Sequence, residues 1–177
     1  MKKLFLLTAV LGIFAFSNVN AQDAAMSGPK LGIGADFAFP SGDFADGYKF
    51  GVGGSLLYQH PIANKLNLTG SAGYLNFTGE SVEIEGVTFK NDAVGFVPVK
   101  VGLRYFLAEN IFINAEAGAA FGTKEGVGTA FAYSPGIGVE FPVADKSAIE
   151  LSGRYEGWSN DGTLSFIGVR LAWNFGL

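Results

Sequence analysis

The sequence predicts an all-β protein, an eight-stranded antiparallel up-and-down transmembrane β-barrel that follows a cleaved signal peptide. Three observations lead to this fold class. The first residues have the charge and hydropathy of an export signal, and eight later segments alternate between apolar and polar residues. The connections between those segments are mostly short at one end of the predicted barrel and longer at the other. Together these features indicate one exported domain whose strands cross a bilayer.

The segment 1–21 has the parts of a secretory signal peptide. Two lysines precede an apolar run of 13 residues, from Leu4 to Phe16, and small or medium-sized residues follow it. Such a run is too short to cross about 30 Å of hydrocarbon as a helix. We therefore expect cleavage before Gln22, which leaves residues 22–177 as the barrel domain.

Composition excludes several classes of protein. Once the two lysines of the signal are removed, ten basic residues face 16 acidic ones, a formal net charge near −6 that argues against a nucleic-acid partner. The chain has no cysteine and one histidine, so disulfides and thiolate or zinc sites are not expected, and neither is a cofactor. No apolar run after Phe16 approaches 18 residues, which excludes membrane-spanning helices.

Period-two alternation predicts the strands. Between Ala93 and Phe106 the odd positions are mostly apolar, whereas the even positions include Lys100 and Arg104. The same pattern occurs in residues 30–39, 50–60, 65–77, 111–121, 129–141, 148–158 and 167–175. In the segment 65–77 the phase slips near Leu75 and Phe77, so we expect a bulge or an early strand end there.

The connections predict which end of the barrel faces outward. Short connections are expected at 60–64, 107–110 and 142–147, and longer ones at 41–49, 79–92 and 122–128. The last connection, 159–163, is short for its side. Transmembrane barrels have short periplasmic turns and longer extracellular loops, and a tilted strand of about 10 residues matches their apolar belt of about 25 Å.

The two faces of the strands differ in charge, and this difference predicts their sidedness. One face is apolar and rich in aromatics, with groups near both strand ends that fit interfacial girdles. The other carries glycines and nine charged residues: Asp36, Lys100, Arg104, Glu116, Glu140, Glu150, Arg154, Glu156 and Arg170. Because eight strands enclose little space, we expect small and charged residues inside, paired with one another, and large apolar residues toward lipid. A soluble lipocalin-like carrier is the alternative.

Several segments resemble a known family. They are 39–44, 72–77, 97–105, 133–138 and 168–175. On these segments the chain resembles the small outer-membrane β-barrel (porin family, OmpX-like) proteins of Bacteroidetes-type bacteria, over nearly all of residues 22–177. The resemblance implies a barrel in the outer membrane and a C-terminal signal, here Phe175 and Leu177, for the outer-membrane assembly machinery. It does not specify an activity.

Catalytic chemistry has weak support in the sequence. A Ser-His-acid hydrolase needs a histidine base, and His60 precedes a proline in an expected turn. Glu150 and Glu156 share a face with Arg154 and are interpreted as a structural ion-pair network rather than an acid–base pair. We therefore expect no catalytic, cofactor-binding or metal-binding residues, and no enzymatic activity.

The sequence leaves four functions open. The leading hypothesis is a structural or surface-interaction protein, monomeric, in contact with outer-membrane lipid, with loops 41–49 and 79–92 available to an extracellular partner. A narrow pore for ions or small solutes is the second. A lipid-modifying barrel enzyme and the soluble carrier are the third and fourth.

Overall fold

The computed structural model describes residues 28–84, 87–90, 92–160 and 162–177. The signal peptide expected at 1–21 lies outside these residues. Strands make up most of the described chain, as the alternation predicts.

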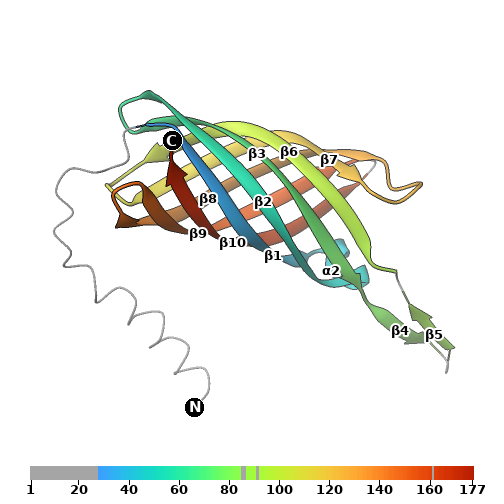
Figure 1. Cartoon of the computed structure of the whole chain (residues 1–177). Helices are drawn as coiled ribbons and strands as arrows, with labels where there is room; N and C mark the ends of the chain where they lie inside the picture. Colours follow the sequence, from blue (N-terminus) through green and yellow to red (C-terminus); the bar gives the residue numbers. More distant parts are fainter. Residues whose placement is uncertain (1–27, 85–86, 91, 161) are drawn as a thin grey trace, which may run out of the picture.

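Eight strands form one closed antiparallel barrel, which confirms the predicted fold class (Figure 1). The strands are β1 (Lys30–Ser41), β2 (Tyr48–Ala63), β3 (Leu66–Gly79), β6 (Val94–Phe106), β7 (Ile111–Gly122), β8 (Thr129–Ala144), β9 (Ser147–Ser159) and β10 (Thr163–Gly176). Each pairs with its neighbours along the chain, and β1 closes the ring on β10 with a continuous register from Lys30 opposite Gly176 to Ser41 opposite Ser165. Closure leaves no barrel strand with an unpaired edge.

The two ends of the barrel differ in their connections. A five-residue helix, α2 (Asp43–Gly47), and a hairpin of β4 (Ser81–Ile84) and β5 (Val87–Lys90) lie at one end, and the C-terminus lies at the other (Figure 1). They occupy the connections expected to be long. Short turns face the periplasm in transmembrane barrels, so the end with α2 and the hairpin is the extracellular end.

Two of the expected short turns are even shorter in the structure. Strand β2 continues to Ala63 and β3 begins at Leu66, so the turn is Asn64 and Lys65, with Lys65 at a φ of 61°. The expected turn at 60–64 is therefore wrong, and His60 lies within β2 opposite Leu68. The turn between β8 and β9 likewise shrinks from the expected 142–147 to two residues. The cause in both cases is a ladder that pairs past a proline near the strand end.

The expected bulge or early end near Leu75 and Phe77 is also wrong. Strand β3 continues to Gly79, and these two residues keep the register with β2 and β6 that the rest of the strand has. Their side chains are buried because they point into the lumen, where a cluster of apolar side chains surrounds them. What looked like a change of phase is a change in what fills the lumen.

The outer wall is an apolar surface. Large hydrophobic side chains are exposed all around it, with Val101 at 65% and Phe131 at 58% among the most exposed. Aromatic side chains occur toward both ends of this wall: Phe39, Phe121, Phe131 and Tyr133 at the extracellular end, and Tyr58, Tyr105, Trp173 and Phe175 at the other. A continuous apolar exterior suits lipid rather than water.

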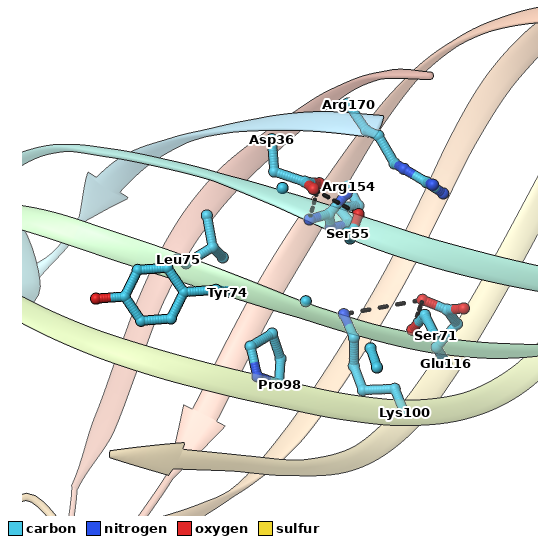
Figure 2. A pocket seen from close by; sticks show the side chains of 13 residues that line it. Asp36, Ser55, Ser71, Tyr74, Leu75, Pro98, Lys100, Glu116, Arg154 and Arg170 are labelled. Atoms are coloured by element: carbon cyan, nitrogen blue, oxygen red, sulfur yellow. Dashed lines mark hydrogen bonds and ion pairs between the residues drawn. The ribbon is translucent and has the colours of Figure 1, made fainter. Parts of the chain in front are cut away.

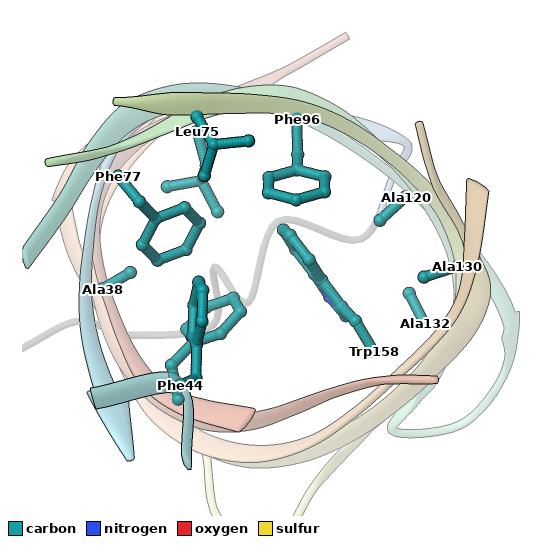
Figure 3. Packing of buried hydrophobic residues seen from close by; sticks show 11 residues of the cluster. Ala38, Phe44, Leu75, Phe77, Phe96, Ala120, Ala130, Ala132 and Trp158 are labelled. Atoms are coloured by element: carbon teal, nitrogen blue, oxygen red, sulfur yellow. The ribbon is translucent and has the colours of Figure 1, made fainter. Parts of the chain in front are cut away.

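The lumen is filled by two kinds of side chain. Charged and polar groups predominate in its periplasmic and central parts. An aromatic cluster lies inside the ring of strands at the extracellular end (Figure 3). The expectation that large apolar residues would stay out of the lumen is wrong: Phe77, Phe96, Trp158 and Phe166 point inward at the extracellular end, and Phe112 is buried inside near the periplasmic end. Glycines make the space for such rings, since a Cβ at Gly51 would lie 2.7 Å from the ring of Phe77 and a Cβ at Gly138 would overlap the ring of Phe112.

Candidate functional site

All nine charged residues singled out from the sequence lie on the inner face of the barrel. Seven are almost fully buried, and the side chains of Glu116 and Arg154 are 8% and 13% exposed. They come from β1, β6, β7, β8, β9 and β10, and each is placed inside because it has the phase opposite to the apolar residues of its strand. Their contacts form two layers.

The first layer surrounds Glu150, near the periplasmic end. Arg104 donates two hydrogen bonds to its carboxylate, at 2.8 and 3.2 Å, and Arg170 lies 3.9 Å away. Asn174 and Ser152 donate to the same carboxylate at 3.1 and 3.0 Å. The guanidinium carbon of Arg104 also lies 3.7 Å from the ring centre of Phe112, a cation–π contact.

This layer extends to the periplasmic mouth through Glu140. Lys30 donates to Glu140 at 3.1 Å, and Asn174 donates to it at 2.7 Å while also contacting Glu150. The register places Glu140 directly opposite Glu150 on neighbouring strands. Two like charges at such positions repel unless cations separate them, and Lys30 and Arg104 supply one cation for each.

The second layer surrounds Glu156, in the central part of the lumen. One of its oxygens accepts from Lys100 at 2.5 Å and from Arg154 at 2.6 Å, and the other accepts from the indole N–H of Trp158 at 3.0 Å. Arg154 also bonds Asp36 at 2.8 Å, and Ser55 donates to Asp36 at 2.5 Å. Trp158 therefore ties the ionic layer to the aromatic cluster above it.

Glu116 connects this layer to the opposite wall. Its carboxylate accepts hydrogen bonds from Thr69 at 3.2 Å and Ser71 at 3.4 Å, and it lies 3.8 Å from Lys100. Lys100 bonds Ser134 as well, at 2.8 Å. Side chains from four strands thus meet at one lysine.

The charges in the described lumen cancel. Five cations, Lys30, Lys100, Arg104, Arg154 and Arg170, face five anions, Asp36, Glu116, Glu140, Glu150 and Glu156. Sequence reasoning missed Lys30, although its phase in β1 is that of Asp36. Alternation places Ser134, Ser152 and Asn174 on the same face as the charges, but it does not identify them, or Ser55, Thr69 and Ser71, as hydrogen-bond partners, because it does not say which side chains meet. A neutral, paired interior is what a low-dielectric environment requires.

A small cavity lies between the second layer and the aromatic cluster (Figure 2). It measures about 30 Å³, enough for one or two water molecules. Asp36, Lys100, Glu116, Arg154 and Arg170 line it together with apolar groups such as Leu75. The cavity also borders Pro98 of β6, which has no N–H to donate to β3.

The described side chains do not assemble a familiar catalytic or metal-binding group. His60, the chain's one histidine, is on the outer face of β2, 3.3 Å from the hydroxyl of Tyr58, and lies apart from the lumen carboxylates. Over the described ranges, no three His, Cys, Asp or Glu residues are arranged to hold a metal ion. Glu150 and Glu156 are each paired with cations inside the lumen.

A family model decides the identity. Residues 6–175 match the model described as the outer membrane protein beta-barrel domain. The chain belongs to this family. Among curated proteins, no sequence matches it.

Solved structures of the same architecture come from several bacteria. The crystal structure of Ail, the attachment invasion locus protein of Yersinia pestis, is 19% identical, with a TM-score of 0.57 over 85% of this chain and 99% of Ail. Neisserial surface protein A is 13% identical, with a TM-score of 0.59 over 85% and 98%. OprG from Pseudomonas aeruginosa is 9% identical, with a TM-score of 0.59 over 84% and 95%. At these identities the likeness shows the fold.

The family and the apolar wall together place this protein in the outer membrane as a transmembrane barrel. The soluble-carrier alternative is therefore wrong, because that kind of barrel has a polar exterior. In the described part of the chain, no helix has the length and hydropathy needed to cross a membrane.

Proposed function

We propose that this protein is a non-enzymatic outer-membrane barrel with a structural or surface-interaction role, which holds loops outside the cell on a rigid, filled scaffold. The observation that carries the proposal is the filled lumen. Paired charges occupy its periplasmic and central parts, and the aromatic cluster occupies its extracellular end. A barrel filled in this way suits anchoring and display better than passage of solutes.

Conductance in planar bilayers tests this proposal against the narrow-pore alternative. The cavity of about 30 Å³ is the observation that favours a pore, since it shows that the packing near Lys100 is incomplete. We expect no stable channel from the folded protein. As a matched comparison, the double variant Lys100→Ala and Glu156→Ala removes one central ion pair and widens the lumen. Steady unitary currents from the unmodified protein would contradict the proposal.

The contacts at the extracellular end support a role for loops 41–49 and 79–92. Lys49 and Glu80 form an ion pair at 3.1 Å, which joins the two loops, and Asp92 lies 3.8 Å from Lys124 of the next loop. These pairs join the loops near their bases, and the β4–β5 hairpin extends from there beyond the barrel mouth (Figure 1). We propose that an extracellular partner binds the two loops. Exchanging both loops for short Gly-Ser turns should abolish binding of whole cells to such a partner while the barrel still folds.

The remaining contacts follow from the same proposal. The apolar wall is in contact with outer-membrane lipid, and the C-terminal Phe175 and Leu177 are recognised by the outer-membrane assembly machinery of the bacterium, which we place among Bacteroidetes-type bacteria. The barrel acts as a monomer. Replacing Phe175 and Leu177 with serine should lower the yield of folded barrel in cells, with little effect on refolding from urea into detergent.

The paired state of Glu150, Arg154 and Glu156 supports the non-enzymatic part of the proposal. A lipid-modifying barrel needs a reactive group that reaches the bilayer surface, whereas Glu150 pairs with Arg104 and Glu156 pairs with Arg154 inside the barrel. Mass spectrometry of lipid A and phospholipids from cells with and without the protein tests this point. Identical lipid masses are expected, and a new or missing acyl group would contradict the proposal.

A further inference from the structure

The aromatic cluster at the extracellular end has four rings from the barrel wall. They come from β3, β6, β9 and β10: Phe77, Phe96, Trp158 and Phe166. Neighbouring rings meet edge to face, with centroid distances from 4.9 Å between Trp158 and Phe166 to 6.2 Å between Phe77 and Phe96. This arrangement is the favourable one for aromatic pairs. We call the space that these four rings line the aromatic chamber (Figure 3).

A fifth ring enters this chamber from outside the wall. Phe44 belongs to α2, and its ring centre lies 4.9 Å from that of Phe77 and 6.5 Å from that of Phe166. It is 4% exposed and is the buried residue of the helix, whereas Asp43 and Asp46 are exposed. Burial of this one side chain therefore contributes most of the apolar area that holds α2 against the barrel mouth.

The helix itself is weakly held by local interactions. It has five residues, its N-cap Gly42 forms no side-chain hydrogen bond, and Gly42 has a φ of 59° that favours glycine. A helix of this length has little stability of its own in water. Its C-terminal end is fixed to the residue that follows β3, because Gly47 accepts a hydrogen bond from the N–H of Glu80 at 2.8 Å. The helix α2 is therefore held mainly by its connections to the neighbouring strands and by the buried side chain of Phe44.

We propose that Phe44 is a tethered occupant of a binding site for one aromatic ring, and that a small apolar aromatic molecule can take its place and release α2 from the barrel mouth. This inference goes beyond the proposed structural or display role and does not depend on it. The site favours a ring without polar substituents. The indole N–H of Trp158 is already bonded to Glu156, so the four wall rings offer a ligand no free polar donor.

The first experiment uses Phe44→Ala with benzene as the probe. The variant should unfold at lower urea concentration in detergent micelles, and saturating benzene should restore most of that loss because it fills the vacated space. Phe39→Ala is the matched control, since Phe39 is 48% exposed on the outer wall and leaves no enclosed space. If Phe44→Ala does not fold, Phe44→Leu leaves a smaller space and serves instead.

The second experiment measures the mobility of α2 in the barrel that retains Phe44. The chain has no cysteine, so a nitroxide label on Asp46→Cys reports α2 alone, and a label on Glu125→Cys reports a neighbouring loop as the control. Benzene should sharpen the spectrum of the Asp46 label severalfold and leave the Glu125 label unchanged. Combining Phe44→Ala with the Asp46 label should give the sharp spectrum without benzene.

Both results are required. If benzene raises the urea midpoint of Phe44→Ala no more than that of Phe39→Ala, the chamber is not a binding site and the proposal fails. If benzene raises the urea midpoint of Phe44→Ala but the Asp46 label stays immobile in the barrel that retains Phe44, benzene does not displace Phe44 from the aromatic chamber. That outcome also overturns the proposal.

Discussion

The substitution Glu150→Gln tests the ionic layer of the lumen most sharply. Glu150 is fully buried and is the common acceptor for Arg104, Ser152 and Asn174, with Arg170 close by. Glutamine keeps the shape of the side chain and removes its charge. Two guanidinium groups are then left beside a neutral amide, and the described lumen changes from neutral to a net charge of one positive unit.

The expected cost is large because the orphaned cations cannot reach water. Breaking a buried ion pair by removing one partner costs about 3–5 kcal/mol, which is a large part of the stability of a small domain. The exposed pair of Lys49 and Glu80 provides the control, with Lys49 61% exposed. Lys49→Gln should cost at most about 1 kcal/mol, since water and salt already screen that pair.

Equilibrium urea unfolding in detergent micelles, followed by tryptophan fluorescence, measures both values. A double-mutant cycle with Arg104→Gln adds a second check, because the double variant should cost at least about 1 kcal/mol less than the sum of the single variants. If Glu150→Gln costs no more than Lys49→Gln, the lumen is hydrated and the pairing described here does not stabilise the fold.

Three further substitutions, with one control, test the wall, the aromatic cluster and the packing around Phe112 by urea unfolding. Phe77→Ala should cost about 3–5 kcal/mol, since it opens a cavity among buried rings; a cost under about 1 kcal/mol would mean that the aromatic cluster is loosely packed. Val101→Arg, at a lipid-facing position in mid-strand, should cost about 2–4 kcal/mol in lipid vesicles, and a neutral effect would place Val101 away from lipid. Gly138→Ala should cost about 1–3 kcal/mol because its Cβ would overlap Phe112, whereas Gly153→Ala, with open space around it, should be neutral; equal effects would refute the lumen packing.

Alternation was sufficient to predict the barrel and the sidedness of its strands. In β6, the apolar Val99 and Val101 face outward and Lys100 and Arg104 face inward, as their positions in the sequence require. Alternation with a period of two residues predicts sidedness because the two faces of a barrel wall have opposite polarity. The same rule misread Phe77, because it assumes that the inner face is polar along its whole length.

The sequence does contain a signal for the aromatic cluster. Phe96 has the phase of Lys100, Trp158 has the phase of Glu156, and Phe166 has the phase of Arg170. Large apolar residues that share the phase of charges, at the extracellular ends of several strands, indicate an apolar layer inside the barrel. Reading the strand ends separately from their middles would have found it.

Ion-pair partners could not be predicted from the sequence. Lys30 bonds Glu140 across 110 residues, and Arg154 bonds Asp36 across 118. Which charges meet depends on the registers of strands all around the ring and on side chains that cross the lumen. The alternation places each charge inside and says nothing about its height relative to a distant strand.

The central claim is that apolar side chains face lipid while the lumen is sealed from it, and the two tryptophans of the chain test this directly. Trp173 is 43% exposed on the wall, and Trp158 is fully buried in the aromatic chamber. In vesicles of lipid with brominated acyl chains, the Trp158→Phe variant, which retains Trp173, should lose most of its fluorescence. The Trp173→Phe variant, which retains Trp158, should keep most of its own. Stronger quenching of Trp158 than of Trp173 would contradict the account.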